Sequence, residues 1–267
     1  MSTLRSRDNP RVRRWHALAH DARTRRAERR ALIEGAHLLA AYLETGARPT
    51  ALIVSEGGRK KPEIAGLVRR AGVEPSVLPD ALFRWMADAV APAGLAAEIE
   101  IASSAAGVAA AGHAVFLDAI QDAGNVGAIL RSAAAFGVDT AVLGHGCADA
   151  WSPKVLRAAM GGHFALRIAQ APDLVAALAE FRGNLVCAVA TGGEVPAAAD
   201  LTGPLGWILG AEGQGVSPAA AARAALHVSI PLAPGVDSLN VAAAAAILFY
   251  ERTRQIGTGG APFSAPS

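Results

Sequence analysis

The feature that most constrains this fold is a repeated order of strand, loop and helix that starts at residue 113. The segments that we predict as strands are continuously apolar, which is typical of parallel strands covered by helices on both faces. Such an α/β domain binds its ligand beyond the carboxyl ends of the strands. We expect strands at 113–117, 140–143, 164–169, 185–189, 205–209 and 227–230, and helices at 126–136, 153–160, 174–181, 218–225 and 239–254.

The residues before this pattern form shorter elements, which indicate a separate, small α/β domain. Ala36, Leu39 and Leu43 recur on one face of a predicted helix, and Asp80 is the expected N-cap of another. Small, uncharged residues at 102–112 suggest a linker, and the Gly-, Pro- and Ser-rich end of the chain is expected to be disordered. We therefore predict an N-terminal domain at 1–103 with helices at 35–44, 62–70 and 80–86 and strands at 51–55 and 74–78, an α/β domain at 112–256, and a tail at 257–267.

Positive charge is concentrated at the start of the chain. Residues 1–30 hold ten arginines against three acidic residues, which gives this arm a formal charge of +7, whereas the whole chain carries only +2. The other residues therefore sum to −5. A basic arm suits the phosphate backbone of a nucleic acid, although an ordinary solvated helix is an alternative that charge alone leaves open. The candidate contacts in this arm are Arg11, Arg13 and Arg14.

A first loop of chemical interest follows the first strand of the α/β pattern, at residues 118–138. A glycine-containing turn leads into a helix for which Asn125 is the predicted N-cap. At roughly 100° per residue, Arg131 lies about 130° from the centre of the apolar stripe of this helix, so it does not serve the core. A plain surface arginine is the usual alternative. Its position just beyond a glycine loop, at the ligand end of the sheet, makes Arg131 a candidate functional group.

A second loop, at residues 207–218, follows another buried strand. Gly210, Gly213 and Gly215 surround Glu212. Glycines in such number let a ligand approach the backbone closely, which would expose amide and carbonyl groups to an adenosine. By itself the pattern is weakly specific, because many tight turns look like this. It also lacks the GxGxxG spacing of a dinucleotide-binding fold.

A third loop lies at residues 228–251. Pro231 ends a strand, and Ser238 and Asn240 flank the start of a helix. Taken alone, these two polar residues are more often helix caps than catalysts. The helix is apolar nearly all round, which indicates burial against other helices or against a second subunit.

One further segment, at residues 152–162, carries a pair of cations. Ser152 is a predicted N-cap with Pro153 at the first helical position. Lys154 and Arg157 are three residues apart and share a face of this helix, so they are candidate contacts to phosphate. The sequence is equally consistent with a pair of solvated cations that bind no ligand.

Composition argues against several other classes of protein. Cys147 and Cys187 lie outside any CxxC or Cys/His cluster, and the seven histidines are not paired at ligand spacing, so we expect reduced thiols in the cytoplasm and no metal. No apolar run approaches the roughly 18 residues that span a membrane. The arginine-rich start has no apolar segment of the kind found in secretory signals.

The three loops, in this order and spacing, resemble the signature motifs of the SpoU/TrmH family within the SPOUT superfamily, and they cover residues 113–252. More loosely, Asn9–Pro10 and Glu34–Gly35 resemble the family's ribosomal-protein-like substrate-binding domain. The resemblance implies a methyltransferase that uses S-adenosyl-L-methionine to methylate the ribose 2′-hydroxyl of transfer or ribosomal RNA. It also implies a homodimer and a C-terminal trefoil knot in the α/β domain. General topology rules disfavour knots, so that expectation depends on the resemblance alone.

Position by position, the resemblance assigns roles to residues of all three motifs. Ala123, Ala159 and Ala211 depart from the family pattern, where proline, serine and a polar residue are frequent; of these, only Ala211 bears on a contact to RNA. The implied catalytic residues are Asn125, Arg131, Glu212, Ser238 and Asn240, and the implied cofactor contacts are Thr191, Gly192, Gly210, Ile230, Leu232 and Leu239.

In this reaction the methyl group is already activated, so the protein must align the ribose oxygen and help it lose a proton. An arginine pKa above about 12 makes a neutral guanidine rare. We therefore expect Arg131 to act as a cation that binds the target phosphate and stabilises the developing alkoxide, with the proton passing to phosphate or water. Glu212 and Asn125 would orient Arg131 and the ribose, while Ser238 and Asn240 would shape the RNA side.

Two other functions are weighed against this one. An inactive RNA-binding paralogue of the same fold is disfavoured because the polar residues of all three motifs are present. A nucleotide-dependent dehydrogenase is disfavoured because GxGxxG with a downstream acid is missing. The separate N-terminal domain favours ribosomal over transfer RNA, by analogy only. No motif indicates which nucleotide is methylated.

Overall fold

The computed structural model describes residues 2–102 and 108–257, so part of the predicted linker and all but the first residue of the predicted tail lie outside the described residues. The chain divides into two compact units. The first unit contains Met1–Ser103 together with Asp149–Phe164, and the second contains Ser104–Ala148 together with Ala165–Ser267. The predicted domain boundary at 103–112 stays a prediction.

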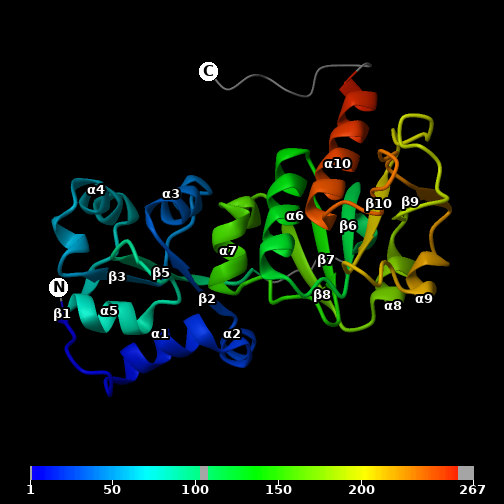
Figure 1. The fold of residues 1–267 in the computed structure, drawn as a ribbon. Helices are drawn as coiled ribbons and strands as arrows, with labels where there is room; N and C mark the ends of the chain where they lie inside the picture. The colour runs from blue at the N-terminus through cyan, green and yellow to red at the C-terminus, as the bar shows by residue number, and fades with distance from the viewer. Residues whose placement is uncertain (1, 103–107, 258–267) are drawn as a thin grey trace. The chain divides into compact units, whose positions relative to one another are not determined.

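The first unit is built on a mixed five-stranded sheet with helices on both faces (Figure 1). α1 (Pro10–His20) and α5 (Asp80–Met86) pack on one face, and α3 (Ala36–Glu44) and α4 (Pro62–Ala71) on the other. The sheet order is β1 (Ser2–Thr3), β4 (Pro75–Leu78), β3 (Ala51–Ser55), β5 (Leu95–Glu100) and β2 (Arg30–Glu34), with β5 antiparallel to both of its neighbours.

The basic arm is folded into two short helices of this unit. Asn9 caps α1 by accepting from the backbone N–H of Arg11, with Pro10 at the first position. Asp21 caps α2 (Ala22–Glu28) in the same way. Val12, Trp15 and Leu18 are buried against the sheet, so the arm is anchored by an amphipathic face.

A segment from the middle of the α/β pattern completes the first unit. It contains α7 (Pro153–Ala159), which Ser152 caps as predicted. Leu156 joins the core beneath α3 and α4. The carboxylate of Asp149 lies 2.7 Å from the guanidinium of Arg25, and both side chains are almost fully buried. Sequence periodicity did not indicate that residues 149–164 belong to the first unit, because this segment follows the ordinary order of strand, loop and helix.

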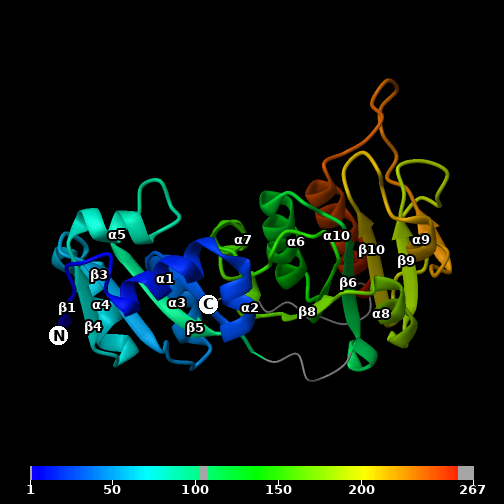
Figure 2. The ribbon, with the colours of Figure 1, turned by 90° about the horizontal axis from the view of Figure 1, so that it is seen from below.

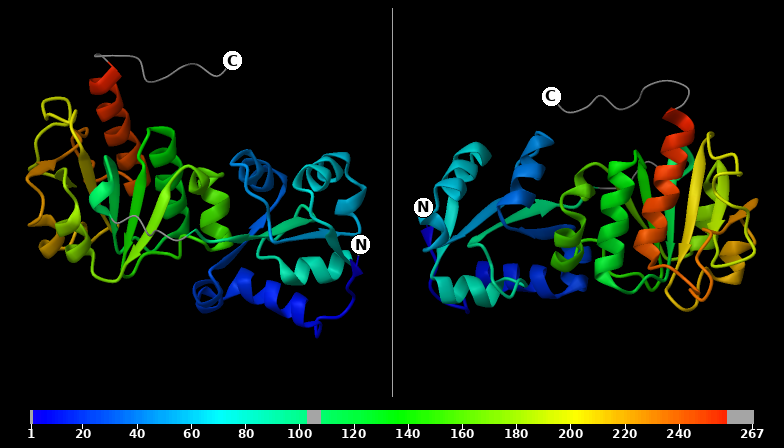
Figure 3. Two further views of the ribbon diagram at one scale, coloured as in Figure 1. Left: turned by 180° about the vertical axis from the view of Figure 1, so that it is seen from behind. Right: turned by 45° about the horizontal axis from the view of Figure 1, so that its top comes forward.

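The second unit is a wholly parallel six-stranded sheet, as the continuous apolar runs predicted (Figure 2). α6 (Ala123–Ala135) and α10 (Val241–Gly257) pack side by side on it (Figure 3), and α8 (Leu174–Glu180) and α9 (Pro218–Ala221) form another pair. The sheet order is β11 (Leu226–Val228), β9 (Asn184–Ala188), β10 (Leu205–Gly210), β6 (His113–Asp118), β7 (Thr140–Gly144) and β8 (Arg167–Ala171).

Some predicted elements were wrong in their boundaries. Phe164 lies in a 3-10 turn, so the strand predicted at 164–169 begins only at Arg167. Asp122, not Asn125, caps α6: its carboxylate accepts from the N–H of Asn125, so the helix starts at Ala123. Likewise α5 begins at Asp80 itself, with Pro79 as N-cap. The helix predicted at 218–225 ends at Ala221, and strands β2 and β5 were not anticipated.

Candidate active site

Three loops meet at the carboxyl end of the second sheet because their strands are neighbours. β6 and β10 pair in parallel, with Gly210 opposite Asp118 at their ends. The carboxylate of Asp118 then accepts from the backbone N–H of Ser217, 2.8 Å away, which ties the loop after β10 to the end of β6. β11 lies beyond β9 in the same parallel sheet and sends the third loop toward the same edge.

Glycines allow the loop after β10 to fold back on its own strand. A side chain at Gly210 would collide with the backbone of Gly215 and Val216. Gly213 and Gly215 have φ of +87° and +70°, a left-handed backbone that other residues rarely adopt. The loop is closed by a backbone hydrogen bond of 2.8 Å from Gly215 to Ala211. The backbone next to Glu212 is therefore fixed and accessible.

Asn240 joins the three loops. Its Nδ2 donates to Asn125 Oδ1 at 2.9 Å and to Glu212 Oε1 at 2.7 Å. Its Oδ1 accepts from the backbone N–H groups of Ala242 and Ala243, which start α10. One side chain thus caps a helix and links one residue from each of the other two motifs.

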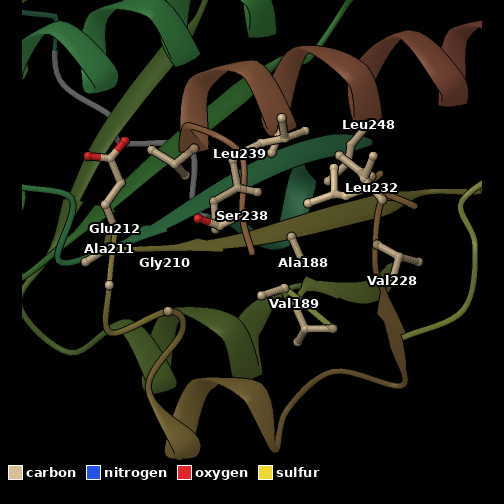
Figure 4. A pocket seen from close by; sticks show the side chains of 17 residues that line it. Ala188, Val189, Gly210, Ala211, Glu212, Val228, Leu232, Ser238, Leu239 and Leu248 are labelled. Atoms are coloured by element: carbon tan, nitrogen blue, oxygen red, sulfur yellow. The ribbon is translucent and has the colours of Figure 1, made fainter. Parts of the chain in front are cut away.

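A cavity of about 300 Å³ opens beside this junction (Figure 4). Its walls are mainly apolar and come from the ends of β9, β10 and β11, the loops after them and the first turns of α10. Glu212 and Ser238 are its polar side chains. Of the predicted cofactor contacts, Gly210, Ile230, Leu232 and Leu239 line the cavity, whereas Thr191 and Gly192 lie just beyond the lining residue Ala190 and do not.

A second hollow, of about 290 Å³, shares Ala211 and Glu212 with the first. Gln121, Asn125 and Gln214 give it a polar character that the first cavity lacks. A group bound here would lie next to a group bound in the first cavity. Sequence reasoning did not anticipate Gln121, Gln214 or the tie made by Asp118, although all three stand in the predicted loops.

Arg131 lies six residues after Asn125 on α6 and is exposed. Its guanidinium makes no hydrogen bond or ion pair with any residue that the structure describes. The structure therefore brings Asn125, Glu212 and Asn240 into direct contact, places Ser238 on the wall of the first cavity, and leaves Arg131 available to a ligand.

The candidate RNA contacts all belong to the first unit. Arg14 is bonded to Glu28 at 2.6 Å and to Glu98 at 2.7 Å, and Arg157 to Asp88 at 2.6 Å. Arg11 donates to Ser76 and lies over the ring of Trp15. These three arginines have structural partners. Arg13 and Lys154 are exposed, and neither side chain is bonded to another described residue.

The cysteines are free thiols, and burial raises the pKa of Cys187 to about 11 and also raises that of Cys147. Both are therefore protonated and unreactive at neutral pH. Within the described ranges, no three His, Cys, Asp or Glu side chains are grouped so that they could hold a metal ion. None of the helices there is long and apolar enough to cross a membrane.

Comparison with known proteins agrees with this geometry. Residues 112–250 match the model of the SpoU rRNA Methylase family, and residues 9–97 match that of the MRM3-like substrate binding domain. The chain is 30% identical to the 23S rRNA (guanosine(2553)-2′-O)-methyltransferase RlmP of Bacillus subtilis, over 94% of this chain and 98% of the relative. It is 28% identical to the mitochondrial rRNA methyltransferase 3A of Danio rerio, over 92% of this chain and 68% of that protein.

Solved structures lead to the same family. The SpoU methyltransferase AviRb of Streptomyces viridochromogenes, in complex with the cofactor AdoMet, superposes with a TM-score of 0.82 at 25% identity, over 94% of this chain and all of the other. The resemblance seen in the three motifs is thereby confirmed. The chain belongs to the SpoU rRNA methylase family, with an α/β methylase domain and an N-terminal substrate-binding domain.

Proposed function

We propose that this protein transfers a methyl group from S-adenosyl-L-methionine to a ribose 2′-hydroxyl of RNA, and of ribosomal rather than transfer RNA. The observation that carries the proposal is the junction of Asn125, Glu212 and Asn240 between an apolar cavity and a polar hollow. Two relatives that match 94% and 92% of this chain support it, because their names are those of ribosomal RNA methyltransferases.

The lining of the first cavity suits the chemistry of the cofactor. Aliphatic walls suit the adenine ring, and the glycine backbone around Gly210, which a side chain would block, offers amide and carbonyl groups. The carboxylate of Glu212 at the shared rim favours the positive charge of a sulfonium. When bound, the cofactor supplies a methyl group that an oxygen nucleophile can attack. Gly210, Ile230, Leu232 and Leu239 would hold it, with Thr191 and Gly192 at its edge.

The residues of this chain would then position and activate the ribose. Asn240 fixes the Glu212 carboxylate and the Asn125 carboxamide, so both are held before substrate arrives. The free guanidinium of Arg131 would bind the phosphate of the target nucleotide and stabilise the 2′-oxygen as it loses its proton. An arginine is a poor base, so phosphate or water would take the proton. Ser238 would line the approach of the ribose.

The test combines transfer and mapping. Purified protein with tritiated S-adenosyl-L-methionine and unmethylated ribosomal or transfer RNA should label the ribosomal RNA, and loss of the gene should remove one 2′-O-methyl site from ribosomal RNA. Labelling of transfer RNA alone would overturn the substrate assignment. Absence of transfer, with cofactor binding also absent in calorimetry, would favour an inactive RNA-binding protein instead.

Three further features belong to the same proposal. We infer a homodimer from the exposed apolar side of α10, where Ile247 and Tyr250 keep 43% and 56% of their surface. Light scattering should give twice the mass of one chain. The trefoil knot that the family resemblance implies, and a cytoplasmic location, are retained as predictions.

A further inference from the structure

α1 and α5 lie side by side on one face of the first sheet (Figure 2). Together with Arg7, their side chains form a stacked group of aromatic and basic residues. The indole of Trp85 stacks on the imidazole of His16, with centroids 4.0 Å apart and planes inclined by 8°. His16 packs in turn against His20 at 4.3 Å. The guanidinium carbon of Arg7 lies 5.1 Å from the Trp85 ring centroid. These contacts hold one cation and two titratable rings at defined positions.

The group lies on the solvent side of α1. Arg13, His16 and His20 are spaced at i, i+3 and i+7 along α1; Arg13 and His20 are exposed, and His16 is half-buried at the edge of the buried face. The side chain of Arg13 makes no hydrogen bond or ion pair with the described part of the chain. We call Arg7, Arg13, His16, His20 and Trp85 the α1–α5 surface.

A protruding apolar tip borders this surface. Val90, in the loop between α5 and β5, keeps 97% of its surface exposed. The loop is fixed at its base, because the backbone N–H groups of Asp88 and Ala89 donate to the carboxylate of Glu34. An apolar side chain held out in this way is available to a ligand.

The acidic residues near the surface have partners other than Arg7 and Arg13. Glu28 pairs with Arg14, and Asp88 pairs with Arg157 through one oxygen while the other lies 3.9 Å from Nδ1 of His20. Asp21 accepts from backbone N–H groups at the start of α2, and Asp8 bonds to the hydroxyl of Ser6. Arg7 and Arg13 are therefore cations without a carboxylate partner among the described residues, and the partner that fits them is an anion.

We propose that the α1–α5 surface is where RNA docks on the first unit, with phosphates on Arg7 and Arg13 and an unpaired base against the half-buried ring of Trp85 and the Val90 tip. The proposal rests on the proposed function, which supplies RNA as the polyanion. RNA fits because it offers phosphates and unstacked planar bases together, which is how aromatic and basic side chains recognise single-stranded segments. Of the arginines predicted for this role, Arg13 is retained, whereas Arg11 and Arg14 have structural partners.

The experiment compares two matched pairs of substitutions. R7A/R13A removes two exposed cations from the α1–α5 surface, and R69A/R70A removes two exposed cations from α4, on the opposite face of the same sheet. The probe is an unmodified transcript of large-subunit ribosomal RNA, measured by filter binding between about 50 and 200 mM salt. We expect R7A/R13A to raise Kd about tenfold and to reduce the log–log salt slope by about 2. R69A/R70A should change Kd less than about twofold.

Two outcomes overturn the proposal: equal weakening by both pairs, which would indicate general attraction to a basic domain, and no weakening by R7A/R13A. Trp85→Phe, which keeps an aromatic ring for the base to contact, and Trp85→Ala separate the role of the base from that of charge; only the alanine variant should weaken binding. Calorimetry with S-adenosyl-L-methionine should be unchanged in all variants. Failure of the proposed function would look different, because the unaltered protein would then transfer no methyl group.

Discussion

The two units differ in charge as clearly as in topology. The first contains nineteen Lys and Arg against thirteen Asp and Glu, a formal charge of +6, whereas the second contains six against ten, or −4. In the second unit Arg167 pairs with Asp139 and Arg254 with Glu251, and Arg252 donates to a backbone carbonyl. The second unit, which holds the candidate site, therefore has few cations available to bind RNA phosphates.

This difference indicates a division of labour. Binding to the RNA backbone depends on counterion release and so on the number of available cations, which favours the first unit. Holding a cofactor and orienting a ribose need fixed polar groups and accessible backbone instead, which the second unit supplies through its glycine loops and Asn240. A substitution in one unit should therefore leave the binding property of the other unit unchanged.

The largest expected effect is on the stability of the first unit. Asp149→Ala leaves the buried guanidinium of Arg25 without its carboxylate, which should lower the free energy of unfolding by about 3–5 kcal/mol. Asp149→Asn, which keeps an acceptor, should cost less. Denaturant unfolding followed by tryptophan fluorescence measures the change, and S-adenosyl-L-methionine binding by the second unit should persist. An unchanged unfolding midpoint would contradict the assigned role of this pair.

The next effect is on catalysis alone. Arg131→Ala should lower kcat by about 10²–10³-fold, because a cation aimed at a developing negative charge is lost. Cofactor affinity, measured by calorimetry, should stay within about twofold, and so should RNA affinity, which depends on the first unit. Arg131→Lys should recover part of the rate, since it keeps the charge but not the fork of donors. Near-normal turnover of the alanine variant would refute the role given to Arg131.

Acid should weaken both units through one buried histidine in each. Burial lowers the pKa of His113 to about 3 and that of His163 to about 4. Below a pH of about 6.5, the ordinary pKa of histidine, these side chains are protonated in the unfolded chain but stay neutral in the folded chain. The free energy of unfolding therefore falls as the pH drops from about 6.5 toward the folded-state pKa values. At pH 5 each histidine should cost about 2 kcal/mol relative to neutral pH.

Substitution separates the two histidines. In His113→Gln the side chain can still accept from Trp207 Nε1, whose bond to His113 Nε2 is 3.0 Å, while it no longer titrates. Acid unfolding of this variant should show a shallower pH dependence in the signal of the second unit only. A pH dependence equal to that of the unaltered protein would exclude His113 as the cause.

The smallest expected effect on stability is at Asn240. Asn240→Ala removes the cap of α10 and should cost about 1 kcal/mol. Asn240→Asp keeps the capping oxygen but cannot donate to Asn125 or Glu212, and it places two carboxylates together. We expect the aspartate variant to fold nearly normally yet to lose activity, as measured by methyl incorporation. Full activity in that variant would remove the junction from the mechanism.

The parallel sheet of the second unit was predictable because the sequence pattern of each of its strands is local. Strands covered on both faces read as apolar runs, and glycine loops with helix caps mark their ends, so most elements of the second unit were placed within a few residues. The first unit was predicted less completely. β5 pairs antiparallel with both β2 and β3, and such long-range pairing leaves little trace in the local pattern of either strand.

The candidate site shows the same limit. Local patterns identified Asn125 and Asn240 as candidate helix caps and Glu212 as an acid in a weakly specific motif. Only the family resemblance implied catalytic roles for all three. Only the folded chain makes Asp122 the cap of α6, which leaves the Asn125 side chain to accept from Asn240. It likewise pairs Arg14 and Arg157 with carboxylates, whereas Arg7 and Arg13 have no carboxylate partner within residues 2–102 and 108–257.

By itself the sequence determined the fold class, the three motifs and the family, because periodicity, glycine placement and residue order are properties of short segments. Tertiary structure decided which polar groups meet, which cations stay available, and that residues 149–164 complete the first unit. These depend on strands and loops far apart in the chain becoming neighbours. Distance in space, which sets every hydrogen bond and ion pair, is the quantity that a linear pattern does not contain.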